Sequence, residues 1–145
     1  MTNWFEAKIK YIKVQEDGRE AKVSESYLVD ALTYGEAENR VIKEMEAIIK
    51  GDLLITGLKK SNITELVESE DENDDRWYKA KVAIVDADEV SGREKVSFQY
   101  FLISAGDIDK ASEYLRNSLS TWVVPYEIVT ISDTTFMDVF KYIAE

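Results

Sequence analysis

Aromatic and cationic side chains alternate in two short segments of the 145-residue chain, a pattern that suits binding of an anionic ligand. Side chains of one parity lie on the same face of a β-strand. In the two segments that parity is held by Trp4, Lys8, Lys10, Trp77, Lys79 and Lys81. Sheet faces that carry exposed aromatic rings and lysines stack nucleobases and neutralise phosphates in single-strand binding modules. The pattern therefore predicts a nucleotide or a single-stranded nucleic acid as one candidate ligand.

The strands expected next in the chain add hydroxyl and amide groups to this face. By parity they contribute Ser24, Ser97 and Gln99, together with Lys22, Ser26 and Lys95. The same face also receives the apolar residues Ile12, Leu28, Val85 and Phe101, which suit a protein partner or a second copy of the chain. A third interpretation is a plain solvated sheet face, because antiparallel sheets with one wet side alternate in this way.

Composition excludes several kinds of chemistry. The chain has no Cys and no His, so it has no disulfide, no Cys or His zinc site, no Cys nucleophile and no His general base. The six glycines are scattered and form no phosphate-binding loop. We therefore expect no catalytic residue, no metal and no cofactor, and we expect that the protein is not an enzyme. A carboxylate-based enzyme is the one catalytic alternative that remains.

A run of acidic residues, 68–75, divides the chain near its middle and holds six carboxylates. The chain as a whole carries 18 Lys+Arg against 29 Asp+Glu, a formal net charge of −11. Such a run is typical of a solvated, mobile linker, and its spacing does not match a calcium-binding EF-hand loop. An alternative is mimicry of a phosphate backbone, by which an acidic protein would inhibit a larger partner.

The chain contains an internal repeat. Residues 4–9 align with residues 77–82, both beginning with Trp, an aromatic residue, and then Ala-Lys one position later, at an offset of 73. The same offset pairs Tyr27 with Tyr100, and it grows to 74 only near the turns. We predict a single domain, 1–145, made of repeats 1–67 and 76–145 joined by the acidic linker 68–75.

Each repeat is predicted to contain strand, strand, helix and strand. In the first repeat the strands are 4–14, 22–31 and 52–59, with a helix from the capping residue Thr33 to Lys50 and a C-terminal cap at Gly51. In the second repeat the strands are 77–85, 95–104 and 124–131, with a helix capped by Asp107. A further helix is predicted at 134–143, because Phe136, Val139, Phe140 and Ile143 fall on one side.

These elements predict an α+β fold. Two pseudo-symmetric ββαβ repeats form an antiparallel sheet, or two half-sheets, with the helices packed on one face. Neither repeat buries enough apolar surface to be stable alone, so we expect both to share one core.

Several strings resemble a small bacterial family of unknown function. They are Trp4-Phe5-Glu6-x-Lys8, Tyr27 to Thr33, Glu36-Ala37-Glu38 and, most specifically, Asp71 to Lys81, which reads Asp-Glu-Asn-Asp-Asp-Arg-Trp-Tyr-Lys-Ala-Lys. The resemblance spans nearly the whole chain. It implies a stand-alone, single-domain protein of bacteria or their phages, and it assigns neither an activity nor a site to any residue.

We therefore expect a non-catalytic protein-interaction module, acting as an adaptor or inhibitor of a larger partner or as a homodimer. The alternative is a nucleotide or single-stranded nucleic-acid binder that uses the Trp/Lys face. The N-terminal residues lack the apolar core of a signal peptide and no apolar run is long enough to span a membrane. We expect a cytoplasmic protein with no membrane partner.

Overall fold

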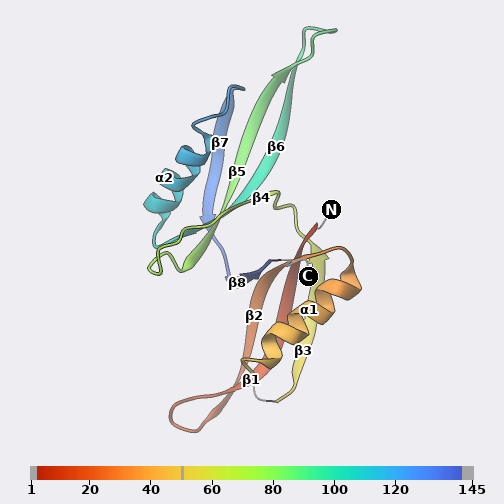
Figure 1. Ribbon diagram of the computed structural model, residues 1–145, viewed down its shortest axis with the longest axis vertical. Coiled ribbons are helices and arrows are strands. Elements are labelled where there is room, and N and C mark those ends of the chain that lie inside the picture. Colours follow the sequence, from red (N-terminus) through yellow and green to blue (C-terminus); the bar gives the residue numbers. More distant parts are fainter. Residues whose placement is uncertain (1–2, 50, 142–145) are drawn as a thin grey trace. The chain divides into compact units, whose positions relative to one another are not determined.

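The structure is a computed structural model that describes residues 3–49 and 51–141. Over these residues it is an α+β protein, with eight strands in two four-stranded sheets and two helices (Figure 1). The chain divides into two compact units. Unit 1 comprises Met1–Asn62 and Thr135–Glu145, and unit 2 comprises Ile63–Thr134.

Unit 1 contains one helix and one sheet. The elements are β1 (Asn3–Val14), β2 (Glu20–Ala31), α1 (Tyr34–Glu46), β3 (Leu53–Lys60) and β8 (Phe136–Phe140). The strand order is β3-β1-β2-β8. β1 runs antiparallel to both of its neighbours, whereas β8 runs parallel to β2.

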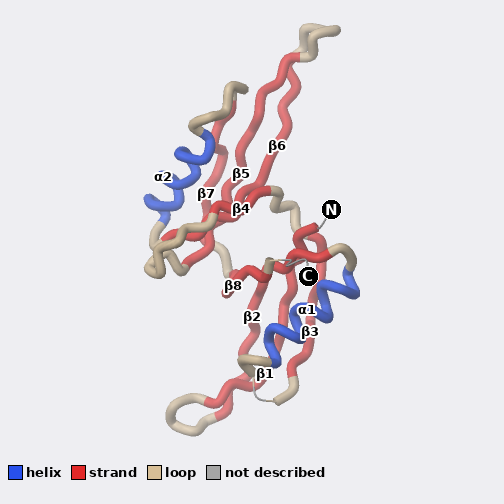
Figure 2. Tube along the Cα trace, viewed as in Figure 1, coloured by secondary structure: helices blue, strands red, loops and turns tan. Residues whose placement is uncertain are grey.

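Unit 2 has a corresponding arrangement. Its elements are β4 (Glu65–Val67), β5 (Arg76–Ala87), β6 (Glu94–Ala105), α2 (Ile108–Leu119) and β7 (Tyr126–Asp133). The strand order is β4-β6-β5-β7, with β5 antiparallel to both neighbours and β4 parallel to β6. Figure 2 shows the β5–β6 hairpin running on beyond the end of β7.

Each of the two short strands, β4 and β8, pairs in a different sheet from the strand that precedes it in the chain. β4 follows β3 in sequence but pairs in unit 2, and β8 follows β7 but pairs in unit 1. The helix predicted at 134–143 is therefore wrong over Phe136–Phe140, which is a strand, and Ile143 lies outside the described residues. The physical reason is that pairing with β2 over Ser26–Val29 satisfies the backbone as well as a helix would. The sheets are consequently mixed rather than wholly antiparallel.

The strand residues of the opposite parity to the predicted lysines face the helices. Phe5, Ala7 and Ile9 pack in one buried cluster with residues of α1, namely Ala37, Val41 and Met45. Tyr78, Ala80 and Val82 pack in another with residues of α2, namely Ala111, Leu115 and Leu119. Among the described residues the helix-side core thus forms two clusters, one in each unit, where the sequence predicted one shared core.

Both helices begin at the predicted capping residues, but α1 ends earlier than predicted. The Thr33 hydroxyl accepts a hydrogen bond from the Glu36 amide at 3.1 Å, and the Asp107 carboxylate accepts one from the Lys110 amide at 2.8 Å. α1 ends at Glu46 rather than Lys50, a residue outside the described ones. Gly51 has a φ of +111° but lies beyond the helix, so it is not its cap. No helix within the described ranges is both long and apolar enough to cross a membrane.

Candidate functional site

The candidate site is the sheet face opposite the helix in each unit. In unit 1 the register places Lys8 opposite Ser26, Lys10 opposite Ser24 and Ile12 opposite Lys22. The predicted site residues Lys8, Lys10 and Ser24 therefore share this face and are exposed. Within the described ranges none of Lys8, Lys10 and Lys22 forms an ion pair. Unit 1 therefore presents lysine and serine side chains together on this face, which Glu6 and Asp30 share at its other end.

In unit 2 the predicted lysines lie beside aromatic rings. Lys79 pairs with Leu102 and Lys81 with Tyr100. The Nζ atom of Lys79 lies 5.1 Å from the centroid of the Tyr100 ring, and that of Lys81 lies 4.3 Å from the centroid of the Phe98 ring. Both distances are in the range of cation–π interactions. The lysines thus cover aromatic rings of the neighbouring strand.

The assignment of Ser97 and Gln99 to this face is wrong. Gln99 pairs with Val82 and Ser97 pairs with Ile84, and Val82 packs in the helix-side cluster. Lys95, which pairs with Asp86, likewise lies on the helix side of the sheet rather than on the predicted face. The cause is the hairpin loop 88–93, which is one residue longer than the loop 15–19 of unit 1. A shift of one residue moves every side chain of a strand to the other face.

Phe98 and Tyr100 therefore occupy the positions that the sequence assigned to Ser97 and Gln99. Ala7 pairs with Tyr27 in unit 1, whereas Ala80 pairs with Phe101 in unit 2. The offset of 74 found at the turns thus continues through the second strand. Counting the two hairpin loops would have revealed Phe98 and Tyr100 from the sequence.

The two tryptophans lie at strand ends and do not form an open stacking surface. Trp77 is only 8% exposed, so it is wrong as a ligand-stacking residue, and Trp4 is half-buried. The Trp77 carbonyl accepts hydrogen bonds from the amide and hydroxyl of Thr134, at 3.1 and 2.7 Å. The Trp4 carbonyl accepts one from the Ser61 amide at 2.8 Å. Each tryptophan therefore lies where the chain leaves a strand of its own unit, β3 for Trp4 and β7 for Trp77.

On the sheet face of unit 2 opposite the helix, side-chain exposure increases toward the N-terminal end of β6. Leu102 is fully buried, Tyr100 is half-buried, Phe98 is 47% exposed and Val96 is 53% exposed. Val85, which pairs with Val96, is half-buried. We call the exposed part, formed by Lys81, Val85, Val96, Phe98 and Tyr100, the hairpin face. Strand parity in the sequence placed Lys81 and Val85 on this face but missed its apolar and aromatic residues from β6, Val96, Phe98 and Tyr100.

The acidic segment 68–75 is solvated except for one carboxylate. Asp74 is 6% exposed. Its carboxylate accepts hydrogen bonds from the Ser69 hydroxyl at 2.6 Å, the Tyr114 hydroxyl at 2.7 Å and the Gly106 amide at 2.8 Å. These bonds, that of Ser69 foremost, hold the pKa of Asp74 below its usual value. The hydrogen bond that Tyr114 donates to Asp74 raises the pKa of Tyr114. Asp74 thus ties the predicted mobile linker to α2.

The remaining carboxylates of this segment are exposed. Over the ranges that the structure describes, no three Asp or Glu side chains are gathered to hold a metal ion.

The whole described chain corresponds to one family. No curated protein matches the sequence. A family model matches residues 3–142, a span that includes all of unit 2 and nearly all of unit 1. The chain belongs to the family described as Domain of unknown function (DUF4494).

Proposed function

We propose that the chain is a non-catalytic protein-interaction module that binds its partner through the hairpin face. The observation that carries the proposal is the exposed pair Phe98 and Val96, at 47% and 53%, on an arm of the sheet. Pairing of β5 with β7 ends at Ile84 and Tyr126, so the hairpin continues past the supporting strand. Aromatic residues surrounded by aliphatic ones are enriched at the centres of protein interfaces.

Contacts within unit 2 hold this surface in one conformation before a partner arrives. The Lys81 ammonium lies over the Phe98 ring, and Lys79 lies over the Tyr100 ring. Restricting side chains before binding lowers the entropic cost of association. The hairpin face is thus an organised docking surface rather than a set of isolated exposed residues.

A protein partner is favoured over a nucleic acid by two features of the same hairpin. The ammonium groups occupy the ring faces on which bases would stack, and Trp77 is buried. The outer hairpin, 86–95, carries four carboxylates against Arg93 and Lys95, which disfavours phosphates. The same charges favour a partner with an apolar pocket surrounded by basic residues, consistent with an adaptor or inhibitor of a larger protein.

We also propose that the two units descend from one duplicated ββαβ element. The pairing supports this origin, because β1 shows an irregularity against β3 between Lys8 and Ile9, and β5 shows one against β7 between Lys81 and Val82. In each unit a short strand, β8 in unit 1 and β4 in unit 2, pairs parallel to the second long strand.

The experiment compares the wild-type chain with the variant Val96→Ser/Phe98→Ser in affinity capture from cell extract and in size-exclusion chromatography with light scattering. The control is Val90→Ser, because Val90 is 97% exposed at the hairpin tip, outside the hairpin face. We expect one dominant bound protein, or self-association, that is lost in the double variant and kept in the control. Equal binding by all three chains would contradict the proposal.

Nucleic-acid binding is tested in parallel by titrating fluorescent single-stranded DNA and RNA. Saturable binding that Phe98→Ser abolishes would favour the nucleic-acid alternative over a protein partner.

A further inference from the structure

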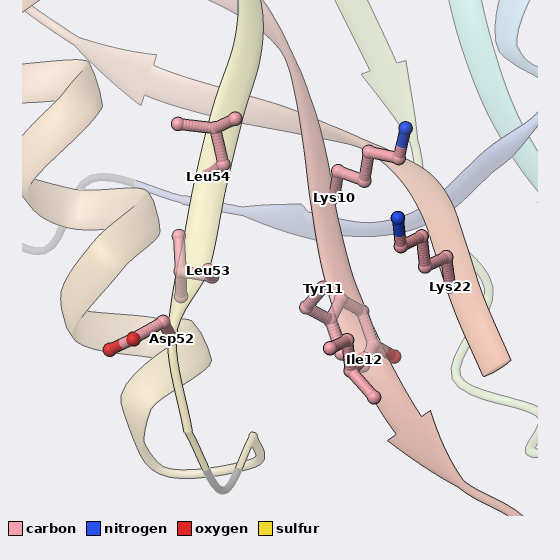
Figure 3. Close-up of a pocket in the computed structure, with 7 residues that line it drawn as sticks. All are labelled: Lys10, Tyr11, Ile12, Lys22, Asp52, Leu53 and Leu54. Carbon is pink, nitrogen blue, oxygen red and sulfur yellow. The ribbon is translucent and has the colours of Figure 1, made fainter. Parts of the chain in front are cut away.

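A surface hollow of about 420 Å³ lies on unit 1. Figure 3 shows the side chains that line it, which come from β1, β2 and the start of β3. Lys10 and Ile12 contribute from β1, Lys22 from β2, and Leu54 from β3, with Asp52 at the margin. The hollow therefore combines cationic and apolar groups in one place.

The cationic part consists of two neighbouring lysines. Ile12 pairs with Lys22 and Lys10 pairs with Ser24, so the two lysines are diagonal neighbours on one face of the sheet. Figure 3 shows both ammonium groups pointing the same way. Neither lysine has an ion-pair partner within the described residues. Two adjacent, unneutralised cations match a ligand that carries two negative charges.

The apolar part consists of exposed aliphatic side chains. Ile12 is 48% exposed and Leu54 is 64% exposed, although both border the hollow. Covering this surface with an apolar or planar group removes it from water, which is favourable. The exposed Asp52 carboxylate repels a second anionic group at its margin. A ligand is thereby oriented with its anionic end at the lysines and its apolar body over Ile12 and Leu54.

We propose that this hollow binds a small phosphate monoester with an apolar or planar body. A phosphate monoester carries about −1.5 to −2 charges at neutral pH, whereas a carboxylate carries one, so the monoester is the better match to two lysines. The site is independent of the hairpin face, because its lining residues belong to unit 1 and those of the hairpin face to unit 2.

The test is a titration of the ¹⁵N-labelled full chain with phenyl phosphate, followed by amide chemical shifts. We expect saturable shifts at Lys10–Ile12, Lys22 and Asp52–Leu54, with a Kd below about 1 mM. Inorganic phosphate has the anionic group alone and phenol has the apolar ring alone. Each is expected to bind at least about fivefold more weakly than phenyl phosphate. Equal affinity for inorganic and phenyl phosphate would overturn the role of the apolar part.

Paired variants separate local recognition from net charge. Lys10→Gln/Lys22→Gln is expected to weaken phenyl phosphate binding about tenfold or more, since each ammonium contributes a charge contact. The control Lys43→Gln/Lys60→Gln removes the same charge elsewhere on unit 1 and is expected to change Kd less than about twofold. The dispersion of the amide spectrum shows that each variant is folded. Absence of saturable shifts in the wild type, or equal loss in both variants, would overturn the proposal.

Discussion

Replacing Phe140 tests the unexpected membership of β8 in unit 1. Phe140 is the last residue of β8 and follows unit 2 in sequence. Its ring nevertheless stacks on that of Tyr27, with a centroid distance of 5.1 Å and an interplanar angle of 10°. Phe140 also packs against the buried cluster beneath α1. We therefore expect Phe140→Ala to destabilise unit 1 and to leave unit 2 unchanged.

The expected magnitude follows from burial and stacking. A fully buried Phe→Ala change costs about 3–5 kcal/mol, but Phe140 is half-buried, so about half of that loss applies. The stacked ring pair accounts for about 0.5–1.5 kcal/mol of what is lost. We estimate a loss of about 2 kcal/mol in the free energy of opening of unit 1, which is roughly a 30-fold change in the opening equilibrium.

Hydrogen exchange followed by mass spectrometry measures both units in one experiment. In Phe140→Ala we expect amides of α1 and β2 to exchange roughly 30-fold faster, while those of α2 keep the wild-type rate. The control is Met137→Ala, which alters a 55% exposed side chain of the same strand and is expected to have little effect. Equal acceleration in α1 and α2, or an equal effect of the two variants, would refute the assignment of β8 to unit 1.

Three further predictions concern the core and two titratable groups. Leu115→Ala, at a fully buried position of the α2 cluster, is expected to lower the stability of unit 2 by about 2–5 kcal/mol in urea unfolding, and a loss below about 1 kcal/mol would contradict this packing. Asp74→Asn is expected to lower the melting temperature at pH 7 more than the exposed Asp75→Asn does. Because the pKa of Asp74 is lowered on folding, the stability that its carboxylate contributes is present above the unfolded pKa of about 3.9 and is lost as the pH falls through the folded pKa. The melting temperatures of the two variants should therefore converge at low pH. Burial foremost, then the Glu25 carboxylate, raises the pKa of Tyr11 to about 12. The stability gained from keeping Tyr11 neutral is present below about pH 10 and is lost as the pH rises to about 12. Ultraviolet absorbance that reports ionisation of Tyr11 near pH 10 in the folded protein would contradict this prediction.

Much of the local structure could be predicted because it depends on short-range patterns. The period of two along β1 places Phe5, Ala7 and Ile9 against α1 and leaves Lys8 and Lys10 exposed, as predicted. The Thr33 and Asp107 caps are likewise properties of the local sequence. These features need no knowledge of distant contacts.

Features that depend on distant pairing could not be predicted in the same way. Phe136, Val139 and Phe140 have the spacing of a helix face, and only the parallel pairing of Phe136–Phe140 with β2 makes this segment a strand. Similarly, nothing in the acidic run distinguishes Asp74 from its neighbours until Ser69, Tyr114 and Gly106 converge on it. The faces of Ser97 and Gln99 depended on one extra loop residue.

The most direct test of the hairpin face as a protein-binding surface is site-specific photo-crosslinking in cells. A photoreactive phenylalanine analogue is incorporated at position 98 in one experiment and at position 90, at the exposed tip, in another. We expect one discrete adduct from position 98 that is absent from position 90 and is lost when Val96→Ser is added. No adduct from position 98, or the same adducts from both positions, would contradict it.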